Sequence, residues 1–200
     1  MNGNLTVKSL AELETTHRRQ AVGIFVDSYY QKLSFLSTET EKLIDVLEHS
    51  FVPEQYYAGL MDETVVGIIA CSTGTSRSHR FDRKQFVKYL GLLRGLLGYR
   101  RLWETLQKPL DLASHQCYIE SVATDTAFRG KGIATKIQDY LLRELPYKEY
   151  LLEVEQSNKA AVKLYQRLGF TVIPKEMQPA AWNAQRKTQM ILMRKCIDTQ

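Results

Sequence analysis

Residues 129–135, with the sequence Arg-Gly-Lys-Gly-Ile-Ala-Thr, combine two glycines with positive charge in a way that suits a phosphate ligand. Strand-forming residues precede this segment over 117–124, and apolar residues at helical spacing follow it over 137–145. The pattern predicts a strand, a tight glycine turn and a helix whose free N–H groups and positive dipole end face the turn. Such a helix start can bind a phosphate or pyrophosphate. A plain strand-to-helix turn would give the same local pattern, and the segment matches neither the Walker nor the dinucleotide-binding glycine sequence.

Two carboxylates lie in predicted strands near this segment and are candidates for acid–base chemistry. Alternation along the first strand predicts that Tyr118, Glu120, Val122 and Thr124 share one face. A carboxylate in an otherwise apolar strand is costly unless it has a partner or a chemical role, and general-base catalysis is such a role. Glu153, in the next predicted strand, is a second candidate. Either side chain could instead pair with an Arg or Lys.

The six residues Arg129 to Ala134 resemble the pyrophosphate loop of the GNAT superfamily of acyl-CoA-dependent N-acetyltransferases. That loop has the pattern Arg or Gln, two residues, Gly, one residue, and Gly or Ala. The sequence Leu-Glu-Val-Glu-Gln-Ser-Asn over 152–158 resembles the next strand and the following helix start of the same superfamily. The Asn opens that helix, Tyr165 follows seven residues later, and Gly169-Phe170 ends the helix. The close resemblance covers residues 118–173, whereas the flanks match only in the order of their predicted elements.

The resemblance implies an acetyl-CoA-dependent N-acetyltransferase that transfers the acetyl group directly to a primary amine within a ternary complex. It implies that the pantetheine arm of acetyl-CoA lies along the backbone of residues 122–124 like an added strand. It also implies that the strand leading to residue 158 splays away to admit this arm. The expected cofactor-binding residues are Val122, Ala123, Thr124, Arg129, Gly130, Lys131, Gly132, Ile133, Ala134, Thr135 and Asn158.

For the chemical step, the resemblance places Tyr165 as a general acid toward the cofactor sulfur, with a plain core tyrosine as the alternative. Glu153 takes the position of the base in the superfamily's protein N-terminal acetylating members, and Glu120 is the other candidate base. The predicted catalytic set is therefore Glu120, Glu153 and Tyr165. Two other classes of function stay open: a non-catalytic acyl-CoA-binding module, and a membrane-surface or nucleic-acid binder that acts through a basic segment.

The predicted fold is a single α/β domain over residues 1–200, of the three-layer α-β-α type that the resemblance implies. Its centre is expected to be a mixed, mostly antiparallel sheet of about seven strands. Strands are expected over 5–10, 56–61, 65–72, 117–124, 149–154, 170–173 and 189–194, and helices over 16–31, 38–50, 137–145 and 158–168. One or two further helices are expected in an insert at about 75–114, between the third and fourth strands.

The insert carries most of the positive charge of the chain. Nine basic and two acidic side chains lie between residues 75 and 110, which gives this segment a charge of +7 in a chain of net charge +5. We expect the insert to form a wall or lid of the acceptor pocket, with the first two helices and the loop over 174–187, and to favour an anionic acceptor. The alternative is that its apolar stripe packs on the domain, on a partner subunit or on a membrane. That stripe comprises Phe86, Leu90, Leu93, Leu97 and Trp103.

The composition is that of a soluble globular protein, with 200 residues, 44% hydrophobic and 24% charged. No apolar run approaches the ~20 residues of a membrane span, and the first residues carry no secretory signal. The cysteines fit no zinc or disulfide spacing, which predicts reduced thiols in a cytoplasmic protein. They are Cys71, Cys117 and Cys196.

The histidines form no metal-ligand spacing and are expected on the surface or in loops. They are His17, His49, His79 and His115. The expected ligands are therefore acetyl-CoA and an amine, without a metal. No nucleic-acid partner and no transmembrane segment are expected, and a homodimer stays open.

Overall fold

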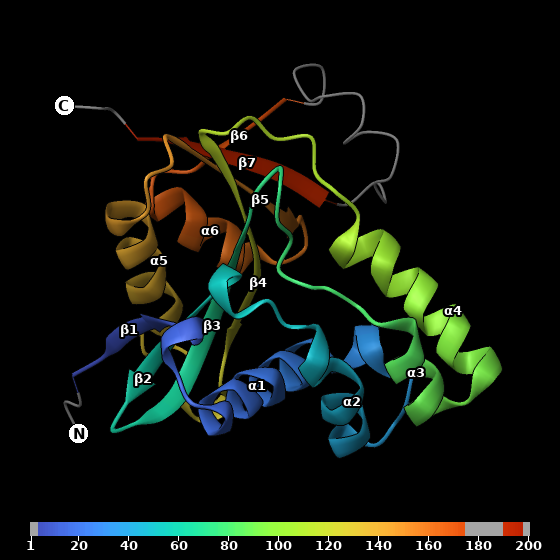
Figure 1. Ribbon diagram of the computed structural model, residues 1–200. Helices are drawn as coiled ribbons and strands as arrows, with labels where there is room; N and C mark the ends of the chain where they lie inside the picture. Colours follow the sequence, from blue (N-terminus) through green and yellow to red (C-terminus); the bar gives the residue numbers. More distant parts are fainter. Residues whose placement is uncertain (1–3, 175–189, 198–200) are drawn as a thin grey trace.

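The computed structural model describes residues 4–174 and 190–197. Seven strands form one sheet in the order β1-β2-β3-β4-β5-β7-β6, with β4 and β5 as its parallel pair (Figure 1). The strands are β1 (Thr6–Ser9), β2 (Tyr56–Met61), β3 (Thr64–Ser72), β4 (Gln116–Thr124), β5 (Glu149–Glu155), β6 (Thr171–Val172) and β7 (Met190–Cys196). The mixed, mostly antiparallel sheet is therefore confirmed. The loop expected over 174–187 lies, apart from its first residue, outside the described residues.

Helices cover both faces of the sheet and complete the three layers that the sequence predicted. The core on one face includes α1 (Thr15–Leu33) and α2 (Thr40–Leu47), and the core on the other includes α5 (Ile133–Glu144) and α6 (Lys159–Arg167). The neighbouring β3 residues Ile68 and Ile69 belong to opposite cores, as the alternation of side chains along a strand requires. The two cores are called the α1 face and the α5 face below.

The insert between β3 and β4 is helical, as predicted. It contains α3 (Arg83–Leu90), α4 (Leu92–Leu102) and a π-helical turn at Trp103–Gln107, and it lies beside α2 at the edge of the molecule (Figure 1). Asp82 caps α3 by accepting a hydrogen bond from the Lys84 amide at 2.8 Å. A Cβ atom at Gly95 would lie 2.7 Å from the Phe86 carbonyl oxygen, so the glycine allows α4 to pack closely on α3. None of the helices in the described ranges is long and apolar enough to cross a bilayer.

A bulge in β4 changes which face its side chains occupy. The register with β3 shifts between Ile68 and Ala70, and Ser121 has a φ of +54°. Glu120 pairs with Ala70 of the α1 face, whereas Val122 packs in the core of the α5 face. The expectation that Tyr118, Glu120, Val122 and Thr124 share one face is therefore wrong, because the bulge reverses the alternation between residues 120 and 122.

Candidate active site

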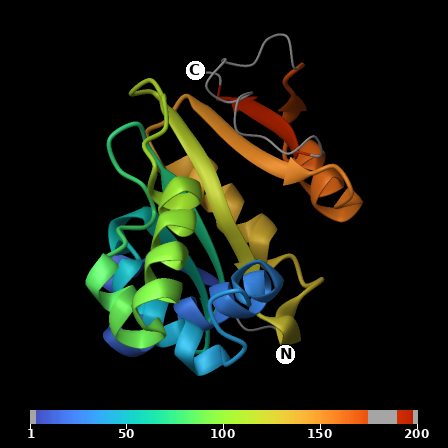
Figure 2. The ribbon, with the colours of Figure 1, turned by 90° about the vertical axis from the view of Figure 1, so that its right-hand side faces the viewer.

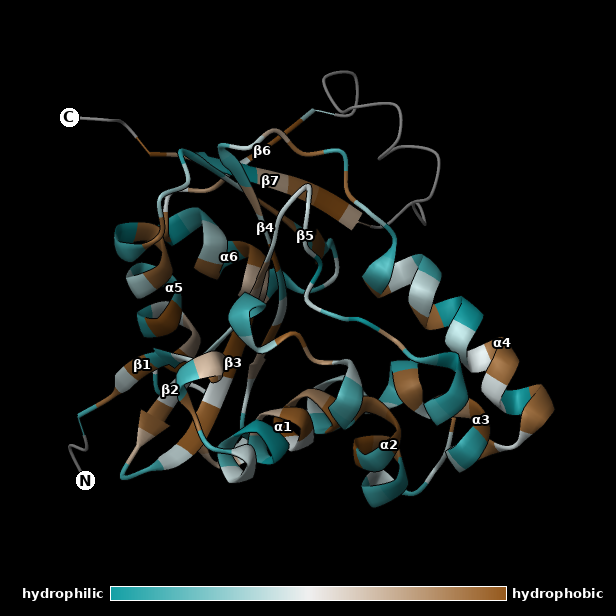
Figure 3. Ribbon diagram, in the orientation of Figure 1, coloured by the Kyte–Doolittle hydropathy of each residue, from teal (hydrophilic) through white to brown (hydrophobic). Residues whose placement is uncertain are grey.

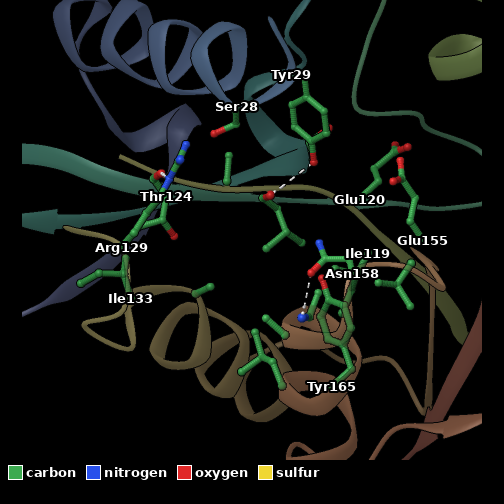
Figure 4. A pocket seen from close by; sticks show the side chains of 18 of the residues that line it. Ser28, Tyr29, Ile119, Glu120, Thr124, Arg129, Ile133, Glu155, Asn158 and Tyr165 are labelled. Carbon is green, nitrogen blue, oxygen red and sulfur yellow. Dashed lines mark hydrogen bonds between the residues drawn. The ribbon is translucent and has the colours of Figure 1, made fainter. Parts of the chain in front are cut away.

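The parallel strands β4 and β5 pair over only part of their length. Their register runs from Gln116↔Glu149 to Ile119↔Leu152, and beyond these residues both strands continue without pairing to each other. Figure 2 shows the two strands diverging. A cavity of about 920 Å³ opens where they separate, between α1 on one side and α5 and α6 on the other (Figure 4). The predicted splay next to residues 122–124 is therefore present in the fold.

The glycine loop forms one end of this cavity. Gly130 and Gly132 both have a φ of +76°, a conformation that side-chain-bearing residues rarely adopt, and a Cβ atom at either would meet nothing within 4 Å. Gly132 is the N-cap of α5, and the first helical hydrogen bond runs from the Lys136 amide to its carbonyl at 3.0 Å. The amides of residues 133–135 therefore have no partner within the helix. Open space in front of free N–H groups fits a pyrophosphate.

The positive charge at this end is smaller than the sequence suggested. Arg129 lines the cavity and donates from Nε to the Thr124 carbonyl at 3.2 Å. Lys131, a predicted cofactor-binding residue, is not among the lining residues, and its ammonium lies 4.7 Å from the centre of the Phe128 ring. Lys136 lines a separate pocket beside the start of β1. Of the groups in and beside the glycine loop, the free backbone amides and Arg129 are thus those that face the cavity.

The two predicted residues of α6 both line the cavity. Asn158 caps the helix, because its Oδ1 accepts a hydrogen bond from the Ala161 amide at 3.1 Å. Tyr165 lies two turns further along the same helix, 6% exposed, with its ring 5.9 Å from that of Phe170. Burial raises the pKa of Tyr165 to about 12, so its hydroxyl keeps its proton at neutral pH. A buried, protonated hydroxyl is what a general acid at this position requires.

Glu120 also lines the cavity, and it forms the ion pair that the sequence left open as the alternative to catalysis. Its Oε2 accepts from Arg77 Nη2 at 2.9 Å, and its Oε1 accepts from the hydroxyls of Ser72 and of Ser78, the latter at 2.6 Å. The Arg77 and Glu120 side chains are only 7% and 9% exposed. These contacts take up both acceptor positions of Oε1 and one of the two on Oε2.

Glu153 and its neighbour Glu155 line the cavity from β5. Leu152 and Val154 belong to the α5 face, so Glu153 and Glu155 point toward the α1 face, the side on which Glu120 lies. The Glu155 carboxylate accepts a hydrogen bond from the Lys32 ammonium at 2.7 Å, and this contact lowers the pKa of Glu155. Figure 4 shows Glu120 and Glu155 on the same side of the cavity. The two candidate bases, Glu120 and Glu153, thus face the same part of the cavity.

The C-terminal half of α1 forms one wall of the cavity, as expected of the first predicted helix. Residues 27–32 line the cavity, whereas no residue of the insert at about 75–114 does, so the insert is not a wall of this cavity. Tyr29 donates its hydroxyl to the Val122 carbonyl at 3.2 Å, and burial raises its pKa (Figure 4). The sequence marked Tyr29 only as part of an apolar stripe. The backbone of α1 departs locally from helical φ/ψ at Tyr29. No feature of the sequence predicts this departure or the contact with Val122.

His79 lies in the connection between β3 and α3, so it is a loop residue as expected, but it is buried, which the sequence did not predict. It is 1% exposed, and it hydrogen-bonds to Ser50 Oγ through Nδ1 at 3.0 Å and to the Tyr56 hydroxyl through Nε2 at 2.9 Å. Tyr56 in turn donates to Ser121 Oγ at 3.3 Å, at the bulge that lines the cavity. Burial lowers the pKa of His79 to about 3, so the ring is neutral at physiological pH. Residues 77–79, at the start of the insert, therefore hold Glu120 and Ser121 of the cavity wall in place, Ser121 through Tyr56.

The part of the chain that the structure describes contains no cluster of three or more His, Cys, Asp or Glu side chains that could hold a metal ion. Within the same ranges the cysteines are unpaired, with Cys71 and Cys117 buried and Cys196 exposed.

Comparison with known proteins places this geometry in context. Residues 22–170 match the family model described as "Acetyltransferase (GNAT) family". N-alpha-acetyltransferase 30 from Xenopus laevis is 43% identical over 56 residues, which are 26% of this chain and 20% of that protein. The chain thus matches about a fifth of the length of this curated relative.

Solved structures share the fold at low sequence identity. An N-acetyltransferase from Staphylococcus aureus Mu50 has 19% identity and a TM-score of 0.59, with 94% of this chain and 98% of that chain covered. Ard1 from Thermoplasma volcanium has 17% identity and a TM-score of 0.53, with 98% and 99% covered. The ribosomal-protein-S18-alanine N-acetyltransferase from Escherichia coli has 15% identity and a TM-score of 0.53, with 98% and 96% covered. These likenesses concern the fold alone.

Proposed function

Because the chain belongs to the acetyltransferase (GNAT) family, we propose that it is an acetyl-CoA-dependent N-acetyltransferase. It transfers the acetyl group to a primary amine by direct attack within a ternary complex. The observation that carries the proposal is the cavity between the separated ends of β4 and β5. It has free helix-start amides at one end and the protonated Tyr165 hydroxyl at the other.

The residues present fit acetyl-CoA as the co-substrate that the family normally uses. Ile133, Ala134 and Thr135 offer amides to a pyrophosphate, and the unpaired edge of β4 offers backbone groups to the amide-containing arm. Tyr29 already occupies the Val122 carbonyl, so the arm bonds to the other groups of this edge. Asn158 closes the far side by fixing the start of α6.

Acetyl-CoA supplies the thioester that the amine attacks. Tyr165 donates its proton to the leaving sulfur, and the high pKa that burial gives this hydroxyl keeps the proton available throughout the physiological pH range. The α1 face of the cavity receives the amine, because the carboxylates of β4 and β5 gather there. Removal of a proton from the ammonium form of the amine is then the remaining task.

We assign that task to Glu153. Three of the acceptor positions of Glu120 are taken by Arg77, Ser72 and Ser78, which hold its carboxylate in a fixed place. Glu120 therefore acts as a positioning residue, which anchors the bulge of β4. Glu153 takes the proton directly or through one water.

The acceptor is a primary amine, and the first candidate is the α-amine of a peptide. The similarity to an N-alpha-acetyltransferase, over 26% of the chain, is the reason to test the α-amine of a peptide first. The reduced state expected of the three cysteines supports a cytoplasmic location.

The test is an acetyl-transfer assay with acetyl-CoA and a panel of peptide N-termini, free amino acids and polyamines, in which released thiol is measured. We expect Tyr165→Phe and Glu153→Gln to lower turnover by about 10²–10⁴-fold. Their affinity for acetyl-CoA, measured by calorimetry, should stay at the parental value. Glu149→Gln is the matched control, since Glu149 lies on the same strand but is not among the residues that line the cavity.

Two results would overturn the proposal. Tight binding of acetyl-CoA without amine-dependent thiol release across the whole panel would make the protein a binding module. Parental turnover in both variants, with Glu149→Gln also unaffected, would show that the assigned residues do no chemistry.

A further inference from the structure

The outer face of α4 carries an apolar surface that no described residue covers. Leu92, Leu93, Leu96 and Leu97 are 64%, 79%, 37% and 71% exposed, and we call them the leucine patch. The other large apolar side chain that is exposed in the described ranges is Val172 on β6, at 48%. Four exposed leucines within six residues form a contiguous patch of the kind that marks an interaction surface.

The leucine patch is not required for the packing of α4 on the protein. The opposite side of the helix makes those contacts: Gly95 lies against the backbone of α3, Gly98 lies against Leu36, and Leu102 is buried in the core of the α1 face. A surface helix ordinarily has one apolar stripe toward the core and a polar outer face. Here the outer face of the first two turns is apolar as well, and Figure 3 shows this hydrophobic end of α4 at the margin of the molecule.

The helical hairpin that carries the leucine patch is rich in basic side chains. Between residues 82 and 101 there are six basic side chains and one acidic side chain, that of Asp82, which already caps α3. The six basic side chains are all exposed: Arg83, Lys84, Lys88, Arg94, Arg100 and Arg101. An apolar face edged by lysine and arginine is the pattern of a helix that lies in the interface of an anionic membrane.

We propose that the α3–α4 hairpin binds the surface of membranes that contain anionic lipids. The leucine patch enters the boundary between headgroups and acyl chains, and the six basic side chains contact the lipid phosphates and carboxylates. With 11 residues, α4 is far shorter than the ~20 residues of a spanning helix, so it lies on the bilayer and does not cross it.

The charge around the leucine patch favours an anionic membrane as its partner over a second copy of the chain. Two copies joined through their leucine patches would bring twelve basic side chains together against two acidic side chains from each copy. Asp82 already caps α3, and Glu104 already pairs with Arg100 at 3.2 Å. The patch also occupies only two helical turns, roughly 11 Å of helix. A stable protein interface needs about 800 Å² on each partner.

The experiment is co-sedimentation of the full chain with vesicles of phosphatidylcholine alone and of phosphatidylcholine mixed with phosphatidylserine. We expect binding to the mixed vesicles that weakens as salt is added. Lys88→Glu and Arg94→Glu should each weaken binding at least about fivefold, since each basic residue near an anionic surface contributes about that factor. Leu93→Ser combined with Leu97→Ser should weaken it further, and these exposed positions permit the change without loss of fold.

Matched controls are Val172→Ser, which removes an exposed apolar side chain elsewhere, and Lys163→Glu, which reverses an exposed charge on α6. Both should bind vesicles like the parent. Acetyl-CoA affinity reports an intact fold in every variant. The proposal is overturned if the parent does not bind anionic vesicles, or if the leucine variant binds them as well as the parent. It is equally overturned if the parent self-associates but does not bind lipid, and the leucine variant abolishes this self-association.

Discussion

Buried His79 should make the stability of this protein fall as the pH falls. The unfolded chain binds a proton at this histidine below about pH 6.5, whereas in the folded protein burial holds the pKa of His79 at about 3. The unfolded state therefore binds more protons between these two values. Stability is complete above the unfolded pKa and is lost progressively as the pH drops toward 3.

The magnitude follows from the difference between the two pKa values. Each unit corresponds to about 1.4 kcal/mol, so His79 alone removes up to about 5 kcal/mol over the full window. Between pH 6.5 and 4.5 the expected loss is about 2 kcal/mol, a large share of the 5–15 kcal/mol that stabilises a typical domain. The buried contacts of the ring with Ser50 and Tyr56 are made by the neutral form, which has one donor and one acceptor.

The assay is urea unfolding of the parent and of His79→Gln at several pH values between 7.5 and 4.5. The glutamine cannot titrate, so it should lower stability at pH 7.5 but show a shallower dependence on pH. The difference in unfolding free energy between the two proteins should shrink by about 1.4 kcal/mol per pH unit below pH 6. Other titrating groups cancel in that difference. Parallel pH profiles for the two proteins would refute the reasoning.

Two further predictions concern the site. Arg77→Met should lower the free energy of unfolding by about 3–5 kcal/mol, because it leaves the buried Glu120 carboxylate without its cation. In urea unfolding, the double variant with Glu120→Gln should recover most of this loss. Additive losses would mean that the pair is not coupled. Gly132→Ala should destabilise the free protein by about 1–2 kcal/mol through its positive φ. It should also reduce the rise in melting temperature at saturating acetyl-CoA, and an undiminished rise would exclude this loop from the cofactor site.

The parts of the site that the sequence predicted correctly are those in which local chemistry and spacing decide the structure. Gly130 and Gly132 take a backbone conformation that favours glycine, so their positions predict the turn. Asn158 is a favourable helix cap, and the seven-residue spacing from it brings Tyr165 to the same side of α6. Each of these features depends on a few neighbouring residues, which makes it readable from the chain alone.

The parts that the sequence could not predict depend on contacts between distant segments. Ser121 has no intrinsic preference for positive φ, so the bulge and the reversal of faces after Glu120 gave no local signal. The partner of Glu120 is Arg77, 43 residues away in a segment whose basic charges were expected to favour an anionic acceptor. His79 lies in that same basic segment, and its burial follows from packing among Phe51, Tyr56 and other rings.

The incomplete pairing of β4 with β5 has a consequence for how cooperatively the molecule unfolds. The sheet consists of one group of strands, β1 to β4, and a second group, β5, β7 and β6, joined through four register pairs from Gln116↔Glu149 to Ile119↔Leu152. Local opening along such a boundary requires less free energy than global unfolding. A ligand bound across the gap contacts both groups and must be released before they separate. Its binding energy is therefore added to the cost of that opening, so the substrate-bound protein unfolds more nearly as one unit than the free protein does.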